Sequence, residues 1–451
     1  MIARTHLARV GSAVLLLVAL GAVSGVAEAD ISEWEAPQVV DGSDQILLSS
    51  LISTERGRAV ALYKTNGAVW ASSRPPGAGM PWTRPRELAV SRRSSVGPVA
   101  TNSNGGATVF FDYGVYSYSH IDASGHWGRV RTFPYQDQLD LRGSLVTPDS
   151  DLVAGGTTFR RVKVAVKSKG DPWTLSPGLS LGYTALRGLW YDRDGRVHVL
   201  ITQDQNIDTR ISEQRQGVGS SYPVGLYEAV LHKRDGALSW GPLRQWRTGT
   251  VGDVYDYSSL STSLLSTDDG DITALWYEHD AQGDLFQLMR HRDASSGWSP
   301  TRSMPVDGIS QVRKSSLDDS GTTRLSYLEL GSDGLTRQLV TRELSAGGIL
   351  SDPVPVDSPI PADVVGYGLY SVSAPGGATL LRLYLSSDTG ADQRLYRCLP
   401  GGACAGIGSM SLPADPGMAI TRTGAALLVG VDAVEGCPPA RLCSRRHAPP
   451  A

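Results

Sequence analysis

Residues 264–306, LLSTDDGDITALWYEHDAQGDLFQLMRHRDASSGWSPTRSMPV, contain the clearest example of a unit that recurs along almost the whole chain. The unit reads as a strand, an Asp-Gly turn, a strand, a polar loop, a strand, an Asp-to-Trp turn and a last strand. Short alternating strands separated by turn signals are typical of one four-stranded blade of a β-propeller. The sequence therefore predicts an all-β fold.

The first mark of each unit is a glycine turn followed by a run of β-branched and apolar residues. These glycines are Gly57, Gly106, Gly195, Gly270, Gly321, Gly377 and Gly424. An equivalent turn is expected near residues 149–151, which makes eight turns spaced mostly about 45 to 55 residues apart. Glycine suits such turns because two-residue hairpin loops need positive φ. Eight four-stranded blades are predicted, with seven as the alternative if the weakly marked unit at 141–181 merges with a neighbour.

The second mark is a tryptophan that opens the closing strand of a unit. It occurs at Trp82, Trp127, Trp173, Trp240 and Trp298. The N-terminal piece WEAPQVV at 34–40 carries the same signature with no unit before it, whereas the last unit, 419–446, lacks it. We expect the N-terminal strand to complete the last blade, because this closes the ring and leaves no open sheet edge.

Three of the turns place Asp and Trp five positions apart, at Asp122 to Trp127, Asp235 to Trp240 and Asp293 to Trp298. In this the chain resembles the secreted sialidase-like, Asp-box (BNR) repeat propellers. The resemblance implies a turn in which the aspartate caps backbone amides and the tryptophan packs between blades. The Ser or Thr before the Asp and the Gly after it are not kept. The Phe-Arg-Ile-Pro motif of sialidases is absent too, which counts against sialidase activity.

The N-terminus has the features of a secretory signal peptide. Basic residues precede an apolar run at 14–23, and Ala27-Glu28-Ala29 matches an Ala-x-Ala cleavage site. We predict a signal peptide at 1–29, a single propeller domain at 30–451, and a secreted, extracellular monomer with no membrane span after processing. The formal net charge of −3 argues against nucleic-acid binding.

The four cysteines form two loops of equal length. Cys398 and Cys404 enclose LPGGA, and Cys437 and Cys443 enclose PPARL. In an exported protein each loop is predicted to be a local disulfide, although four cysteines allow three connectivities. A zinc site would use tighter Cys pairs, and the acidic run at 268–271 lies at a hairpin turn, so no metal or other cofactor is predicted.

Basic residues recur where the innermost strand of a blade should begin. They are Arg93, Arg142, Arg187 and Arg313, the last followed by Lys314. Because blades are arranged radially, the starts of their inner strands meet at the mouth of a central channel. Guanidiniums gathered there would bind a carboxylate or sulfate bidentately, and sialidase-like enzymes are similar in using an arginine cluster for a sugar carboxylate. The alternative is that each arginine is an ordinary solvated residue at a strand end.

Candidates for acid, base or nucleophile lie in loops of the same face. They are Tyr255, Asp256, Tyr257, Glu278 and His279, with Tyr135, Asp137 and Asp140 before the third inner strand. Tyr with a carboxylate suits glycoside hydrolysis, and Tyr with His suits elimination on a uronic acid, so a glycoside hydrolase and a polysaccharide lyase both stay open. His198 is interpreted as a satisfied blade residue. The polar insertion at 202–225 lies in one unit only, and insertions of this kind are functional or mobile.

These observations predict a secreted propeller that recognises an extracellular, anionic glycan at its central funnel and cleaves it if it is an enzyme. Two other hypotheses remain, a non-catalytic lectin and a scaffold for protein partners. An enzyme should have one dominant charged pocket. A lectin should have similar aromatic sites in several blades, and a scaffold should have a broad exposed apolar patch.

Overall fold

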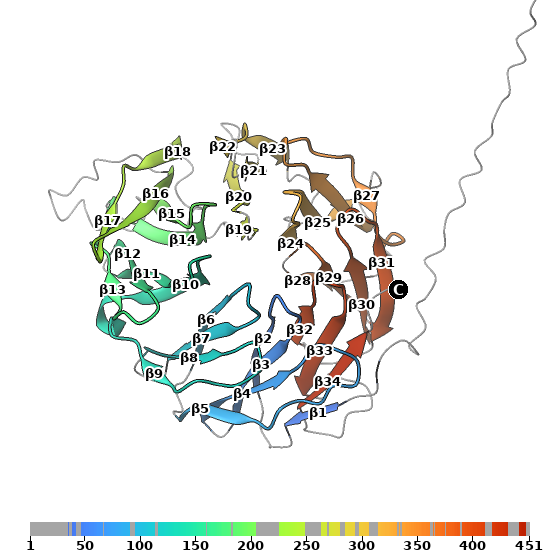
Figure 1. The fold of residues 1–451 in the computed structure, drawn as a ribbon. Coiled ribbons are helices and arrows are strands. Elements are labelled where there is room, and N and C mark those ends of the chain that lie inside the picture. Colours follow the sequence, from blue (N-terminus) through green and yellow to red (C-terminus); the bar gives the residue numbers. More distant parts are fainter. Residues whose placement is uncertain are drawn as a thin grey trace, which may run out of the picture.

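The computed structural model of the chain is a ring of eight radially arranged antiparallel sheets (Figure 1). The described residues are 35, 38–41, 47–65, 67–90, 95–112, 116–158, 160–181, 184–203, 225–248, 263–267, 270–279, 285–293, 297–305, 314–331, 333, 336–360, 364, 366–374, 376–387, 390–410, 417–431 and 442–447. The predicted all-β propeller with eight blades is confirmed, and the seven-bladed alternative is wrong.

Each of the first four blades runs from an inner strand outward along the chain. Blade 1 holds β2 (Leu47–Ser53), β3 (Ala59–Thr65), β4 (Ala68–Arg74) and β5 (Arg86–Val90). Blade 2 holds β6 (Ser95–Thr101), β7 (Ala107–Asp112), β8 (Tyr116–Ile121) and β9 (Arg131–Thr132). After the short 3-10 helix η2 (Gln136–Gln138), blade 3 holds β10 (Asp140–Val146), β11 (Leu152–Thr158), β12 (Arg161–Lys167) and β13 (Thr174–Leu175). Blade 4 holds β14 (Thr184–Tyr191), β15 (Val197–Gln203), β16 (Gly225–Arg234), β17 (Ala237–Trp240) and β18 (Arg244–Thr248).

The remaining four blades repeat this order, and the last one borrows a strand from the N-terminus. Blade 5 holds β19 (Ser263–Ser266), β20 (Ile272–His279), β21 (Leu285–Asp293), β22 (Gly297–Trp298) and β23 (Arg302–Pro305). Blade 6 holds β24 (Lys314–Leu317), β25 (Thr323–Leu330), β26 (Arg337–Leu344) and β27 (Val354–Pro355). Blade 7 holds β28 (Gly366–Ser373), β29 (Thr379–Ser387), β30 (Gly390–Cys398) and β31 (Cys404–Met410). Blade 8 holds β32 (Gly417–Ile420), β33 (Ala426–Val431), β34 (Leu442–His447) and β1 (Gln38–Asp41).

Two blades have an interrupted outer strand. In blade 4, β17 and β18 both pair with β16, and in blade 5, β22 and β23 both pair with β21. The predicted four-strand arrangement therefore holds throughout, with the fourth strand of these two blades in two pieces.

The N-terminal strand closes the ring as predicted. β1 pairs antiparallel with β34, with Val39 opposite Cys443, and it lies beside β34 at the outer edge of the last blade (Figure 1). The backbone amide of Glu35 also donates to the carbonyl of Arg446 at 2.8 Å. Hydrogen bonds of the ladder thus join the two ends of the described chain.

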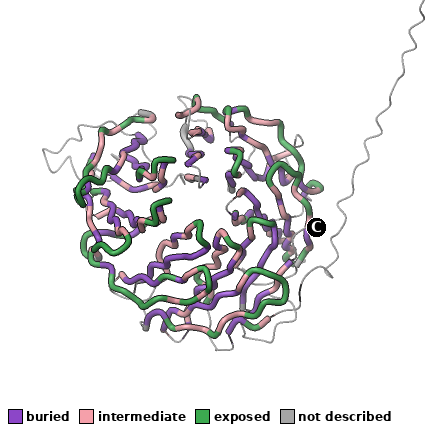
Figure 2. The backbone as a smooth tube through the Cα atoms, viewed as in Figure 1, coloured by how far each residue is buried: buried purple, intermediate pink, exposed green. Residues whose placement is uncertain are grey.

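Packing between neighbouring blades supplies the hydrophobic core. Among the described residues, the buried apolar side chains form eight clusters, and each cluster joins two consecutive blades. Buried positions accordingly follow the middle strands of the blades, and exposed positions lie at the periphery and at inner ends of blades around the central opening (Figure 2). Contacts between successive inner strands, β32 with β2 included, complete the ring at its centre.

The turn between the first two strands of every blade has the same hydrogen bonds. Its first residue donates its amide to the carbonyl four residues on and accepts from the amide three residues on. In seven blades a Thr, Asn or Asp side chain at the first position also accepts from the amide four residues on; these residues are Thr54, Asn102, Thr147, Asp192, Thr267, Asp318 and Thr421. The repeat mark is therefore a polar cap followed by a residue with positive φ.

Two details of these turns refine the sequence prediction. In the third blade the positive φ belongs to Ser150 (64°), which explains why that unit has no glycine mark. In the second blade the left-handed residue is Gly105 (φ 82°) rather than Gly106. At two of these glycines a side chain would also clash with the preceding blade. A Cβ added to Gly270 would lie 2.7 Å from the backbone nitrogen of Arg193, and one added to Gly377 would lie 2.5 Å from the Cβ of Asp318.

These contacts place the turns together on one face of the ring. We call this face the turn face, and we call the opposite edge, where the eight inner strands begin, the strand-start rim.

One contact in each of two Asp-to-Trp turns agrees with what the resemblance implies. Asp122 accepts from the His126 amide at 2.9 Å, and this bond lowers the pKa of its carboxyl. The indole of Trp240 donates to the carbonyl of Pro177 in blade 3 at 2.8 Å, so it packs between blades. Both residues have structural roles.

One of the two predicted disulfides is confirmed. Cys398 and Cys404 are bonded and join β30 to β31 within blade 7. Cys443 in β34 is also disulfide-bonded. Cys437, its predicted partner, lies outside the described residues.

Candidate functional site

The inner strands of the first four blades each contain a β-bulge. Their pairing register shifts between Leu48 and Ser50 in β2 and between Val96 and Val99 in β6. It shifts again between Leu141 and Gly143 in β10 and between Leu186 and Gly188 in β14. The described registers of β19, β24, β28 and β32 have no shift. Because a bulged residue leaves the ladder and re-aims its side chain, half of the strand-start rim differs from the other half.

Two of the predicted arginines occupy these bulges. Arg142 is the extra residue of β10, and Arg187 is the extra residue of β14. Arg142 lies in the first half of β10 and Arg187 near the middle of β14, and these two inner strands contact one another. The structure thus places Arg142 and Arg187 in the inner strands of neighbouring blades.

Glycines make these two bulges sterically possible. Gly156 lies opposite Leu141, and a Cβ added to Gly156 would lie 2.0 Å from the carbonyl oxygen of Asp140. Gly188 follows the second bulged arginine, and a Cβ added there would lie 3.2 Å from the Leu264 Cβ in the next inner strand. In the Arg-Gly pair of β14, the arginine is the bulged residue and the glycine lets the next blade pack closely.

Arg142 is a mostly exposed cation with one carboxylate partner. Its Nη2 lies 2.5 Å from Oδ2 of Asp140, and its side chain is 63% exposed. The hydroxyl of Tyr116 donates to Oδ1 of the same carboxylate at 3.3 Å. Exposed ion pairs of this kind contribute little to stability, so a dissolved anion can compete with Asp140 for the guanidinium.

Arg187 is partly buried and held more firmly. Its Nε donates to Oγ1 of Thr202 in β15 at 3.1 Å. This hydrogen bond holds the guanidinium of Arg187 against its own blade. Less side-chain conformational entropy would therefore be lost when a ligand binds.

The structure reveals a third cation on the strand-start rim that the sequence prediction missed. Arg337, the first residue of β26 in blade 6, stacks over the ring of Tyr367 in β28 of blade 7, with Cζ 4.6 Å from the ring centroid. Tyr367 is 38% exposed. Because Arg337 starts the third strand of its blade, no spacing rule for inner strands could locate it.

A second tyrosine of β28 has a similar partner. Tyr370 is exposed, and the buried Arg382 of the neighbouring strand β29 stacks over its ring at 4.2 Å. The inner strand of blade 7 thus carries two exposed tyrosines, each with an arginine stacked on its ring.

The predicted catalytic residues are only partly located. Glu278 and His279 end β20, the second strand of blade 5, at the edge that faces the strand-start rim. The structure describes their backbone only. Tyr255, Asp256 and Tyr257 lie outside the described residues, as do Arg93, Arg313 and residues 204–224 of the insertion. Their assignments stay predictions.

Tyr135, Asp137 and Asp140 lie around the start of blade 3. The Tyr135 hydroxyl donates to the Trp173 carbonyl at 2.8 Å, which gives this tyrosine a structural bond. Asp137 belongs to η2, and Asp140 begins β10. Of the three, the contacts place Asp140 beside a predicted arginine.

His198 is a satisfied blade residue, as the sequence predicted. Its Nδ1 lies 2.8 Å from Glu228 Oε1 and its Nε2 lies 3.1 Å from Asp192 Oδ2, while the ring stacks on Trp190. Burial alone would lower the pKa of His198, but the hydrogen bonds to the two carboxylates outweigh it and raise that pKa. The two buried carboxylates therefore favour the protonated form of His198, whose ring lies with them between blades 4 and 5.

The residues that the structure describes contain no group of three or more His, Cys, Asp or Glu side chains arranged to hold a metal ion. Within the same residues, no helix is long and apolar enough to span a membrane.

No family model matches the chain, and no curated protein matches it in sequence. Solved β-propeller structures are similar to it in fold. The polysaccharide lyase Uly1 has 10% identity and a TM-score of 0.44, covering 92% of this chain and 98% of the lyase. An ulvan lyase of the polysaccharide lyase PL25 family has 10% identity and a TM-score of 0.43, and the match covers 76% of this chain and 90% of the lyase. The propeller domain of the trilobed protease from Pyrococcus furiosus has 9% identity and a TM-score of 0.43, covering 81% and 97%. These likenesses extend to the propeller fold, and none of them shows a sialidase or Asp-box family.

Proposed function

We propose that this protein is an exported propeller that binds an anionic glycan at its strand-start rim. The observation that carries the proposal is the pair of bulged arginines, Arg142 and Arg187, on neighbouring inner strands. A bulge costs ladder hydrogen bonds, and bulges are over-represented beside functional sites because they re-aim side chains.

The chemistry of the rim supports an anion as ligand. Guanidinium groups match carboxylate and sulfate groups bidentately. Arg142 has a displaceable partner in the exposed Asp140, and Arg187 is already held by Thr202. A ligand with several acid groups would therefore exchange one exposed ion pair for another at Arg142 and gain a second charged contact at Arg187.

The spacing of the cations supports a polymer rather than a compact anion. Arg142, Arg187 and Arg337 come from blades 3, 4 and 6, so their charges are distributed along an arc. A chain of sugars with an acid group on successive residues can meet such an arc, whereas one small anion reaches a single guanidinium. The exposed ring of Tyr367 adds a surface on which a pyranose can pack.

The test compares acidic and neutral polysaccharides on the secreted protein. Binding of polygalacturonate, dextran sulfate and neutral dextran is measured by biolayer interferometry, with reducing ends and 232 nm absorbance followed in parallel. We expect binding to an acidic polymer and none to neutral dextran. Product formation would identify an enzyme, and binding without product would identify a lectin.

Variants then locate the site. Arg142→Ala and Arg187→Ala should each weaken binding about ten- to a hundredfold, because each removes one charged hydrogen-bonding contact. Arg131→Ala, an exposed arginine of the outer strand β9, is the matched control and should bind as wild type. The proposal would be refuted if Arg142→Ala and Arg187→Ala bound the acidic polymer as tightly as wild type does, or if wild type bound neutral dextran as tightly as the acidic polymers.

A further inference from the structure

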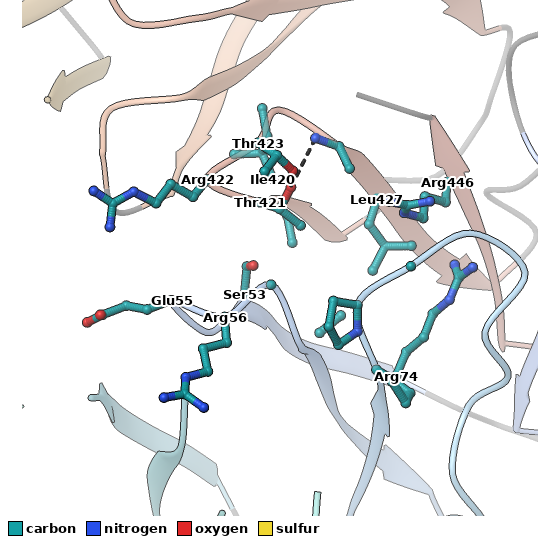
Figure 3. A pocket seen from close by; sticks show the side chains of 17 residues that line it. Ser53, Glu55, Arg56, Arg74, Ile420, Thr421, Arg422, Thr423, Leu427 and Arg446 are labelled. Atoms are coloured by element: carbon teal, nitrogen blue, oxygen red, sulfur yellow. Dashed lines mark hydrogen bonds between the residues drawn. The ribbon is translucent and has the colours of Figure 1, made fainter. Parts of the chain in front are cut away.

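A pocket lies at the turn face, where the first and last blades meet (Figure 3). Its volume is about 410 Å³, within the range of small-ligand sites. One side is the turn of blade 1 with the loop that follows β4, and the other side is the turn of blade 8. The pocket is separate from the strand-start rim, because it is built from the opposite ends of the inner strands.

The pocket exists because long side chains at this seam lean outward. Arg56 packs its stem over Gly105 of blade 2, and Arg422 packs over Gly376 of blade 7. Figure 3 shows the two side chains leaving their turns in different directions. Across the seam, a Cβ added to Gly57 would meet Thr421 at an ordinary 3.5 Å, unlike the tight approach at Gly377.

The walls combine positive charge with apolar surface. Four guanidiniums and one carboxylate line the pocket; they belong to Arg56, Arg74, Arg422, Arg446 and Glu55. Glu35 pairs with both Arg74 and Arg446, and Asp319 pairs with Arg422. The carboxylates of Glu55, Glu35 and Asp319 balance three of the four guanidiniums, so a net charge of about +1 remains.

Arg56 is the cation available to a ligand. Its side chain is exposed, and within the described residues it makes no ion pair or hydrogen bond. Beside it, Pro75, Pro76, Ile420 and Leu427 offer an apolar wall, and Ser53 and Thr423 offer hydroxyls. A hydrated inorganic anion would use the charge and leave the apolar wall uncovered.

We propose that this seam pocket binds a small organic carboxylate whose acid group pairs with Arg56 and whose apolar body covers Pro76 and Leu427. The pocket takes residues from both blade 1 and blade 8, so it is complete only when β1 has closed the ring. A ligand in it therefore stabilises the closed ring by mass action.

The experiment uses the full secreted protein with benzoate as probe and benzyl alcohol as its uncharged counterpart. Binding is measured by isothermal titration calorimetry, and the melting temperature is recorded at saturating probe. We expect benzoate to bind and to raise the melting temperature, and benzyl alcohol to bind at least about tenfold more weakly.

Two variants assign the contact. Arg56→Gln should weaken benzoate binding about ten- to a hundredfold, and Arg131→Gln, an exposed arginine of β9, should leave it unchanged. Circular dichroism confirms that both variants are folded. Equal binding of benzoate and benzyl alcohol, equal affinity of Arg56→Gln and wild type, or no benzoate binding would overturn the proposal. None of these outcomes bears on glycan binding at the strand-start rim.

Discussion

At the scale of single residues, Glu35 holds the N-terminal segment to two distant parts of the chain. Its carboxylate lies 2.6 Å from Arg74 Nη2 in blade 1 and 3.0 Å from Arg446 Nη1 in blade 8. The Arg74 side chain is 2% exposed, so removal of its partner leaves a buried charge uncompensated. Burial alone would raise the pKa of Glu35, but the two arginines outweigh it and hold that pKa below its ordinary value.

We therefore expect Glu35→Gln to lower the free energy of unfolding by about 1 to 3 kcal/mol near neutral pH. A lowered folded-state pKa contributes stability that is present above the unfolded pKa and is lost as the pH falls through the folded pKa. The gap between wild type and variant should thus close below about pH 4. Urea unfolding between pH 3 and 7 measures it, with Glu87→Gln on the exposed face of β5 as control; a gap that persists at the acid end would contradict the assignment.

His198 is a second residue whose pKa is shifted by its neighbours. Asp192, Glu228 and Trp190 surround its ring, and the charge of Arg292 opposes protonation. His291 is buried and His120 is exposed, and neither has such a carboxylate bond. Desolvation lowers the pKa of each.

An NMR titration of the histidine Cε1–H signals tests this contrast inside one molecule. The His198 signal should titrate above about pH 6.5, and the signals of His120 and His291 below it. Because the folded pKa of His198 is raised, its stabilisation is complete below the unfolded pKa and is lost as the pH rises through the folded value. Titration of all three at the same pH would show that the carboxylates do not hold the imidazolium.

At the scale of elements, the bulge in β10 depends on the absence of a side chain in β11. The Asp140 carbonyl occupies the place where a Cβ of residue 156 would lie, at 2.0 Å. The bulge at Arg142 therefore requires the glycine at position 156 on the neighbouring strand.

Gly156→Ala should consequently destabilise the protein by about 3 kcal/mol and weaken acidic-glycan binding, because the backbone near Arg142 must move. Gly402→Ala is the control, since a Cβ there would meet the Leu399 carbonyl at an ordinary 3.7 Å. Thermal unfolding and glycan titration of both variants measure the effect. A Gly156→Ala protein as stable as the control would show that the bulged strand relaxes freely.

At the scale of the whole molecule, stability depends on the closed ring. β1 buries Val40 against the first and last blades and covers the outer edge of β34. Without it, blade 8 has three strands and an exposed ladder edge, which is a template for aggregation.

Deletion of residues 30–41, compared with deletion of 1–29 alone, should lower the melting temperature by at least about 5 °C. It should also increase aggregation, measured by light scattering. The shorter deletion is the control because it keeps β1 and Glu35. Equal melting curves for the two proteins would mean that the N-terminal strand does not hold the ring.

The blade number, the turn positions and the closing strand were predictable from sequence because they depend on local chemistry. A polar cap and a residue with positive φ recur at each first turn, as at Thr267 and Gly270, whatever the neighbouring blades do. The Cys398–Cys404 loop is equally local, since it joins two adjacent strands. The third blade was weakly marked because Ser150 makes the turn that glycine makes in the other seven.

The candidate sites were predictable only in part, because they depend on contacts between residues far apart in the chain. The spacing of the repeats singles out Arg142 and Arg187 as candidates, but the bulges that contain them arise from pairing with β11 and β15. The stacking of Arg337 on Tyr367 and the pocket between Arg56 and Leu427 join different blades. A repeat sequence specifies each blade alone, whereas the small rotation from one blade to the next and the closure of the ring decide which side chains meet.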